Sequence, residues 1–265
     1  MAHGVTAQVI ALRGRRQIQR MAEAIGQDCR VLVAAGGDGT VSAVASVVAG
    51  TEMTLGVLPL GTLNHFARDL GIPLELDGAI EVLARGKCAC VDIGEVNGRK
   101  FVNNSSIGIY PRIVGLRERE QRFGHNKWTA LAMAVLTVLR RSPFWTVRVH
   151  AQNEVVQQRT PFVFIGNNEY ELHGLNIGRR ETMNGGRLFL YVAAHTSRFG
   201  LLRMAMSALL GRLDRKGSLQ MFSVTEAWIE TRRKRVRVST DGEVNWMTSP
   251  LHYRLSPLGL KVIAG

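Results

Sequence analysis

Apolar and polar residues follow two different rhythms along this chain. Up to residue 90, short continuous apolar runs alternate with stretches that have helical spacing. Continuous apolar runs are typical of strands that a parallel sheet buries on both faces. They predict strands at residues 5–10, 31–35 and 55–58, with helices at residues 17–25, 41–48, 63–70 and 76–85. Such alternation predicts an α/β fold with a parallel, doubly wound sheet.

Beyond residue 90 strand-like runs dominate, and turn residues such as Asn97-Gly98 separate them. The expected strands lie at residues 88–95, 100–107, 144–151, 154–166, 187–193, 227–230, 234–240 and 251–263. We therefore expect two domains: an α/β domain over residues 1–90 and an antiparallel β-rich domain over residues 91–265, with the site in the cleft between them.

Two helical stretches, residues 127–141 and 198–216, interrupt the β-rich part. Each carries apolar residues together with basic ones. One interpretation is that they cover a sheet. The other is that one of them lies on a membrane, with its apolar face down and its basic rim on lipid headgroups.

A glycine-rich turn follows the apolar run at residues 31–35. It consists of Gly36, Gly37, Asp38, Gly39 and Thr40. Glycines let a backbone approach a ligand closely, and the helix that follows points its N–H groups at the turn, an arrangement that suits a phosphate. Asp38 and Thr40 are placed to meet a metal or a phosphate. Taken alone, this turn is equally typical of a purely structural connection, and its glycine spacing excludes the dinucleotide fingerprint and the Walker A loop.

A second loop of similar design follows the next predicted strand. Residues 58–64 read Leu-Pro-Leu-Gly-Thr-Leu-Asn, which places Gly61, Thr62 and Asn64 at the start of a helix. Asn and Thr cap helices, and their side chains can also hydrogen-bond a nucleotide. Because loops after successive parallel strands meet at one edge of the sheet, we expect the two loops to lie side by side where such sheets bind ligands.

Together these loops resemble the catalytic domain of the diacylglycerol kinase family, which includes bacterial lipid kinases and sphingosine kinases and has NAD kinases as distant relatives. Two further motifs extend the resemblance over most of the chain. Val-Asp-Ile-Gly at residues 91–94, followed by residues 101–108, resembles the crossover into the family's second domain, and Asp241-Gly242-Glu243 resembles a motif near its C-terminus. The resemblance implies a Rossmann-like first domain and an antiparallel second one.

The resemblance also implies roles for individual residues. Phosphoryl transfer needs positioned phosphates, neutralised charge and an oriented acceptor hydroxyl. The loop of residues 36–40 would hold the phosphates of ATP, with Asp38 on Mg²⁺, and Gly61, Thr62 and Asn64 would hold the rest of the nucleotide. Asp241 would be the general base that takes the proton of a lipid hydroxyl, and Glu243 would assist it or contact the nucleotide or metal. Without its context, the 241–243 motif is a common turn.

Three departures from the family pattern stand out. We expect the first strand of the family and its phosphate-contacting loop to be missing from this sequence, because residues 5–12 resemble the second strand. An Asp often follows the Asn of the second loop, and here that position is His65. Residues 182–188 lack the carboxylate through which many bacterial members bind a structural Mg²⁺, an ion that favours carboxylate oxygen, so this site is doubtful.

Composition narrows the environment in which the protein works. The chain has 265 residues and a formal net charge of +13, so its surface attracts anions. No pattern of a nucleic-acid-binding module is visible, and we expect an anionic lipid surface rather than nucleic acid. No apolar run reaches the roughly 18 residues of a membrane span. We therefore expect a cytoplasmic protein that associates peripherally with membrane, and we leave a homodimer open.

The leading hypothesis is an ATP- and Mg²⁺-dependent lipid kinase that phosphorylates a hydroxyl of diacylglycerol or a similar lipid. The alternative is a non-catalytic family member that acts as a basic nucleotide- or lipid-binding protein. A third reading, phosphorylation of a soluble substrate as in NAD kinases, agrees less well with residues 58–64.

Overall fold

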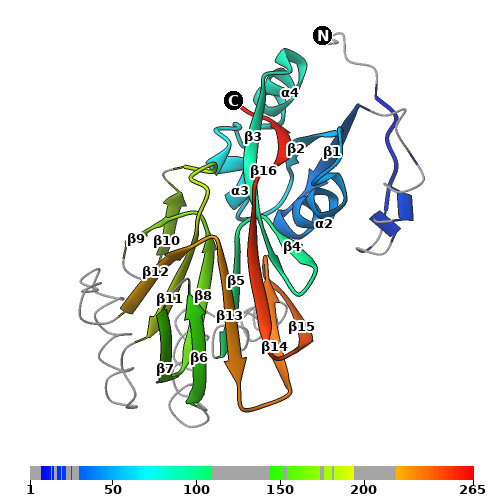
Figure 1. Cartoon of the computed structure of the whole chain (residues 1–265). Helices are drawn as coiled ribbons and strands as arrows, with labels where there is room; N and C mark the ends of the chain where they lie inside the picture. The colour runs from blue at the N-terminus through cyan, green and yellow to red at the C-terminus, as the bar shows by residue number, and fades with distance from the viewer. Residues whose placement is uncertain are drawn as a thin grey trace, which may run out of the picture.

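The structure is a computed structural model that describes residues 7–12, 14, 17–18, 20–21, 25, 30–108, 144–151, 154–173, 176–180, 182–193 and 219–265. Helices and short parallel strands occupy one end of the molecule, and longer antiparallel strands occupy the other (Figure 1). Both helical stretches expected at residues 127–141 and 198–216 lie outside the described residues.

The α/β end is built as the apolar runs predict. Its elements are β1 (Val31–Gly36), α2 (Asp38–Val48), β2 (Thr54–Pro59), α3 (His65–Asp69) and α4 (Leu76–Arg85). β1 and β2 pair in parallel, and α2 buries Val41, Val44 and Val48 in the core that they share. Because the register runs from Val31 opposite Thr54 to Gly36 opposite Pro59, both strands end level with each other at one edge.

The remaining strands form most of two packed sheets and one small ribbon. They are β3 (Cys88–Val96), β4 (Arg99–Phe101), β5 (Asn104–Gly108), β6 (Trp145–Ala151), β7 (Glu154–Thr160), β8 (Phe162–Asn167), β9 (Tyr170–His173), β10 (Asn176–Arg180), β11 (Leu188–Ala193), β12 (Leu219–Val224), β13 (Glu226–Thr231), β14 (Arg235–Thr240), β15 (Glu243–Thr248) and β16 (Leu251–Ile263). One sheet has the order β1-β2-β16-β13-β6-β7, with β3 on β16 and β4 on β3, and the other has the order β12-β11-β8-β5-β14-β15.

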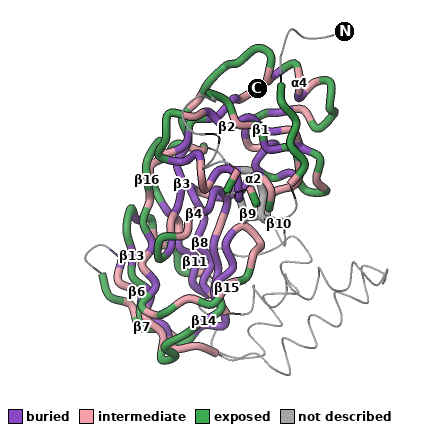
Figure 2. The backbone as a smooth tube through the Cα atoms, turned by 90° about the vertical axis from the view of Figure 1, so that its right-hand side faces the viewer, coloured by how far each residue is buried: buried purple, intermediate pink, exposed green. Residues whose placement is uncertain are grey.

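A shared apolar core holds the two sheets together. Val147 and Tyr253 come from the first sheet, and Ile165, Leu190 and Val238 come from the second. Buried backbone runs along the strands of both sheets, while exposed residues gather at the outer edges and turns (Figure 2). The fold is therefore mixed α/β with a parallel N-terminal sheet and an antiparallel β-rich C-terminal part, as the sequence predicts.

The longest strand, β16, ties the two parts of the chain to each other. It pairs antiparallel with β13 and β3, and its end pairs in parallel with β2 through Val262 and Leu55. Figure 1 shows this strand in red, running from the β-rich end to the α/β end. The C-terminal residues thus complete the sheet that the N-terminal residues begin.

Three predicted strands differ in the structure. The run at residues 154–166 is two strands, because Pro161 cannot donate to a ladder and the chain changes sheets there. The run at residues 100–107 breaks at Val102 and Asn103, whose N–H groups donate to a side chain instead. Residues 7–12 form no strand; Val9 is 91% exposed, and no described strand pairs with this segment.

Candidate active site

The two glycine loops lie against each other, as expected from parallel strands. Gly37 and Gly61 face each other so closely that a Cβ on Gly61 would overlap the Cα of Gly37. The Leu60 N–H also donates to the Gly36 carbonyl over 3.1 Å. A side chain at position 61 would not fit here, so the relative position of the two loops depends on Gly61.

Polar side chains brace the loops from within. Asn64 is buried with φ +50°, and its Oδ1 accepts from the Gly61 N–H over 3.0 Å while its Nδ2 donates to the Pro59 and Gly61 carbonyls. Asp38 Oδ1 accepts from the Phe66 N–H over 3.2 Å, so the first loop caps the short helix that follows the second. Thr62 and Gly39 are both exposed.

The Asp241–Gly242 turn joins β14 to β15 and places Asp241 beside α2. Both turn residues have positive φ, +48° and +84°, which Asp-Gly sequences adopt readily in two-residue hairpins. Asp241 Oδ2 accepts from Ser42 Oγ over 2.7 Å, and Ser42 lies on the helix that the first glycine loop begins. A residue 199 positions away in the sequence is thereby held next to the glycine loops.

Backbone N–H groups of the β4–β5 connection grip the same carboxylate. Val102 N–H donates to Oδ2 over 2.9 Å, and the N–H groups of Asn103 and Asn104 donate to Oδ1 over 2.8 and 3.1 Å. Burial raises the pKa of the Asp241 carboxyl above its ordinary value of 3.8, although the hydrogen bond from Ser42 and those from the backbone lower it. A carboxylate whose pKa moves toward neutrality suits general-base chemistry.

Glu243, the first residue of β15, forms an ion pair with an arginine of the other sheet. It lies two residues beyond Asp241 and pairs with Arg99 of β4, whose Nε also donates to Thr240 Oγ1 over 2.8 Å. This pairing anchors the hairpin on both sides of the turn. Glu243 is thus directed toward Arg99.

A buried arginine supports the opposite side of the β4–β5 connection. Arg180 Nε donates to Asp69 Oδ2 over 2.8 Å, and the two side chains are 0% and 6% exposed. Its Nη1 donates to the Val102 carbonyl over 2.6 Å and its Nη2 to Asn103 Oδ1 over 3.1 Å. Because the Val102 carbonyl and the Asn103 N–H belong to one peptide group, the arginine polarises a donor that binds Asp241.

Metal-binding groups are sparse in the described part of the chain. No cluster of three or more His, Cys, Asp or Glu residues is present there. Near residues 182–188, the buried Asp92 accepts from the Gly186 N–H over 2.7 Å and from the Leu258 N–H over 2.8 Å. Backbone donors therefore satisfy both oxygens of this carboxylate, one of which contacts the segment of residues 182–188.

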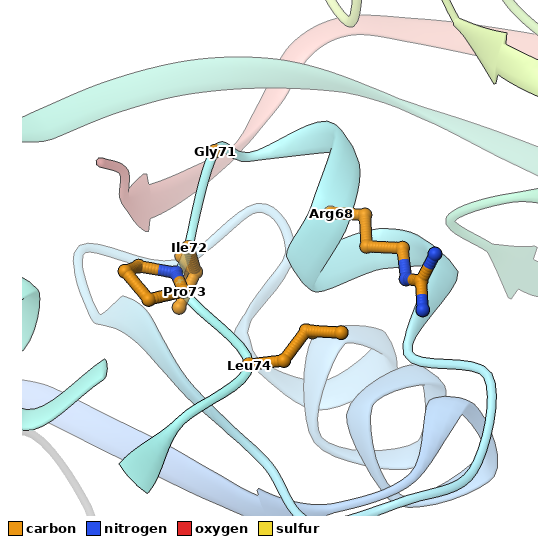
Figure 3. A pocket seen from close by; sticks show the side chains of 5 residues that line it. All are labelled: Arg68, Gly71, Ile72, Pro73 and Leu74. Carbon is orange, nitrogen blue, oxygen red and sulfur yellow. The ribbon is translucent and has the colours of Figure 1, made fainter. Parts of the chain in front are cut away.

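A shallow hollow of about 340 Å³ lies beside α3 and does not involve the glycine loops. It is lined by Arg68, Gly71, Ile72, Pro73 and Leu74, and the Arg68 guanidinium points away from Ile72 and Pro73 (Figure 3). His65, where the family often has Asp, is exposed at the start of this helix.

The arrangement defines a class of protein. Two glycine loops lie at the edge of a parallel sheet, the first of them opens a helix, and a partly buried carboxylate comes in from the β-rich part, an arrangement that phosphoryl transfer could use. Residues 1–96 match the family model of the diacylglycerol kinase catalytic domain, and residues 114–264 match that of the YegS C-terminal NAD kinase beta sandwich-like domain. The chain belongs to the diacylglycerol kinase family.

Curated relatives match about a third of this chain. Diacylglycerol kinases of Staphylococcus saprophyticus and Staphylococcus aureus strain JH9 are 40% and 42% identical over 89 and 87 residues, which is 33% and 32% of this chain. The matched stretch spans only 29% and 28% of the length of those relatives.

Solved structures share the fold over nearly the whole chain. A Bacillus anthracis protein, provisionally assigned as a diacylglycerol kinase, has a TM-score of 0.77 at 22% identity, covering 96% of this chain and 84% of its own. Yeast NADH kinase complexed with NADH has a TM-score of 0.56 at 13% identity, covering 92% of this chain and 64% of its own. At these identities the likeness concerns the fold alone.

Sequence reasoning missed several residues that build the site. The contacts to Asp241, Thr240 and the Val102 carbonyl come from Ser42, Arg99 and Arg180, respectively. None of these three residues belongs to a sequence motif. Only the Val-Asn-Asn run at residues 102–104 carried a signal, as part of the crossover that resembles the family. The sign in the sequence was that Asn103 and Asn104 interrupt the apolar pattern of a strand.

Proposed function

We propose that this protein is a kinase that transfers the γ-phosphate of ATP to a hydroxyl of diacylglycerol or a similar lipid. One observation carries the proposal: Asp241, from the β-rich part, is held against α2, the helix that starts in the first glycine loop. The candidate base and the candidate phosphate-binding loop thus lie together, which supports phosphoryl transfer to a hydroxyl.

The residues present fit ATP that arrives with Mg²⁺. The first N–H groups of a helix have no partner within the helix, and at α2 they belong to Asp38 and Gly39. A Cβ on Gly39 would meet nothing within 4 Å, so the backbone there is open to a ligand. Mg²⁺ is commonly held by one or two carboxylates plus substrate phosphates, and Asp38 would supply one carboxylate. The bound ion would neutralise phosphate charge.

This chain's own residues would prepare the acceptor. Asp241 would accept the proton of the lipid hydroxyl, and the N–H groups of residues 102–104 would hold its carboxylate in place. The lipid would reach the site from an anionic membrane surface, at which the protein would be peripherally bound on the cytoplasmic side. No helix in the described part of the chain is long and apolar enough to cross a membrane.

One observation favours the non-catalytic alternative. A carboxylate has about four lone-pair sites. Four donors already occupy the Asp241 oxygens: Ser42 Oγ and the N–H groups of residues 102–104. In that alternative Asp241 is a structural tie between the two parts of the chain, and a lipid hydroxyl would have to displace Ser42.

Transfer of radiolabelled γ-phosphate separates these functions. The purified chain is given labelled ATP and Mg²⁺ with one acceptor at a time: diacylglycerol in anionic mixed micelles, sphingosine in the same micelles, or NAD in solution. We expect label in the extracted lipid with diacylglycerol or sphingosine. Label on NAD alone would overturn the lipid kinase, and ATP binding without any transfer would establish the non-catalytic alternative.

A further inference from the structure

The outer face of the β14–β15 hairpin combines exposed arginines with an exposed tryptophan. Arg237 lies directly opposite Trp246 in the ladder, and its guanidinium carbon stands 5.1 Å from the centre of the indole ring. Arg235 stands 6.0 Å from the same ring. Trp246 is 56% exposed and Val244, on the same side of β15, is 40% exposed. We call Arg235, Arg237, Val244 and Trp246, with the adjoining turn of residues 232–234, the basic–aromatic face.

The turn adds three more positive charges. Arg232, Arg233 and Lys234 precede β14, and all three are exposed. β14 begins at Arg235, so Arg233 lies in the turn, where its guanidinium carbon stands 4.9 Å from the ring centre of Trp145. Five basic residues therefore gather within six positions at one end of the hairpin.

These charges are not balanced by carboxylates. Among the described residues, no Asp or Glu lies within ion-pair distance of the five. Basic residues of the other sheet behave differently, since Arg148 pairs with Glu230 and Arg254 with Glu95. Unpaired positive charge costs free energy through self-repulsion, and an anionic partner would relieve it.

We propose that the basic–aromatic face docks the protein on an anionic phospholipid surface. Arginines near such a surface are attracted to its headgroups, and tryptophan favours the boundary between headgroups and acyl chains. The purpose of this docking rests on the proposed function. Arg237 lies four residues before Asp241, which is about 13 Å at the spacing of residues in a strand. Docking here would keep the candidate base close to lipid hydroxyls.

Vesicle binding without nucleotide tests the face directly. The probe is vesicles of phosphatidylcholine with about a third phosphatidylserine, compared with pure phosphatidylcholine. The variant Arg235→Gln/Arg237→Gln is compared with Arg85→Gln/Lys261→Gln, which removes the same charge elsewhere. At about 1 kcal/mol per basic residue, we expect the face variant to bind about thirtyfold more weakly and the control far less so. Equal losses in both variants would overturn the assignment.

A second readout depends on contact rather than charge. Vesicles with brominated acyl chains should quench wild-type tryptophan fluorescence, and Trp246→Phe should remove most of that quenching. Unchanged quenching would place the contact elsewhere and overturn the proposal. Tighter binding to an RNA duplex than to anionic vesicles, lost in the Arg235→Gln/Arg237→Gln variant, would reassign the face to nucleic acid.

Kinase assays keep this proposal separate from the proposed function. On a short-chain, water-soluble diacylglycerol, the face variant should retain wild-type turnover, whereas on vesicles it should lose activity in proportion to binding. Equal losses on both substrates would contradict a docking role. Absence of turnover in the wild type would refute the kinase, while the vesicle-binding result would still decide the docking face.

Discussion

Replacing Arg180 by methionine tests whether its buried network supports the site. The substitution keeps much of the side-chain volume but leaves Asp69 charged and without its partner, at 6% exposure. It also removes the donors to the Val102 carbonyl and to Asn103 Oδ1. Breaking a buried ion pair by removing one partner costs about 3–5 kcal/mol.

The chain offers a matched control in Arg85→Met. Arg85 pairs with Glu81 over 2.6 Å, but these side chains are 70% and 54% exposed. An exposed helical pair of this spacing contributes about 0.3–0.5 kcal/mol. In urea unfolding followed by circular dichroism, Arg180→Met should lower the midpoint by about 1 M or more, and Arg85→Met should leave it nearly unchanged.

A double variant shows whether the loss comes from the orphaned charge. Asp69→Asn/Arg180→Met removes both charges, so it should lose less stability than the two single variants add up to. If Arg180→Met costs no more than Arg85→Met, or if the two single losses simply add, the reasoning about the buried pair is wrong.

The remaining predictions concern the loops and the base. Gly61→Ala should lower the free energy of unfolding by about 1–3 kcal/mol, because the new Cβ would overlap the Cα of Gly37. Gly39→Ala should cause no such loss, because a Cβ there meets nothing within 4 Å. Thermal unfolding compares the two variants, and equal losses would contradict the close packing of the loops. Ser42→Ala should move the acidic limb of the pH–rate profile upward, since it removes a hydrogen bond that lowers the pKa of Asp241; a downward shift would contradict the assigned contact. In wild type that limb should lie above 3.8, the ordinary carboxyl value, and a limb at or below it would argue against Asp241 as the base.

Local features of the fold were predictable from the sequence. The helix at Leu76–Arg85 has the predicted bounds, and β1 and β2 follow the apolar runs closely. These elements depend on periodicity and turn residues that lie within about ten positions of one another. The packing of the two glycine loops also followed from the order of two parallel strands.

Contacts between distant residues were not predictable in this way. Asp69 and Arg180 are 111 positions apart, and neither the charge nor the spacing of either residue marks it as buried. The strand predicted at residues 100–107 breaks because Asp241, 137 to 139 positions later, takes three of its N–H groups. The apolar pattern of a strand carries no information about a hydrogen-bond acceptor that comes from a distant part of the chain.

The most direct test of the account compares Asp241→Asn with wild type in ATP turnover on diacylglycerol micelles, alongside ATP affinity and the unfolding midpoint. The exposed Asp77→Asn serves as the control of equal charge change. A general base contributes roughly 10²–10⁴-fold, so turnover should fall by that factor in a folded variant that still binds ATP, with Asp77→Asn unaffected. Turnover by Asp241→Asn at the wild-type rate would show that Asp241 is a structural tie and that the base lies elsewhere.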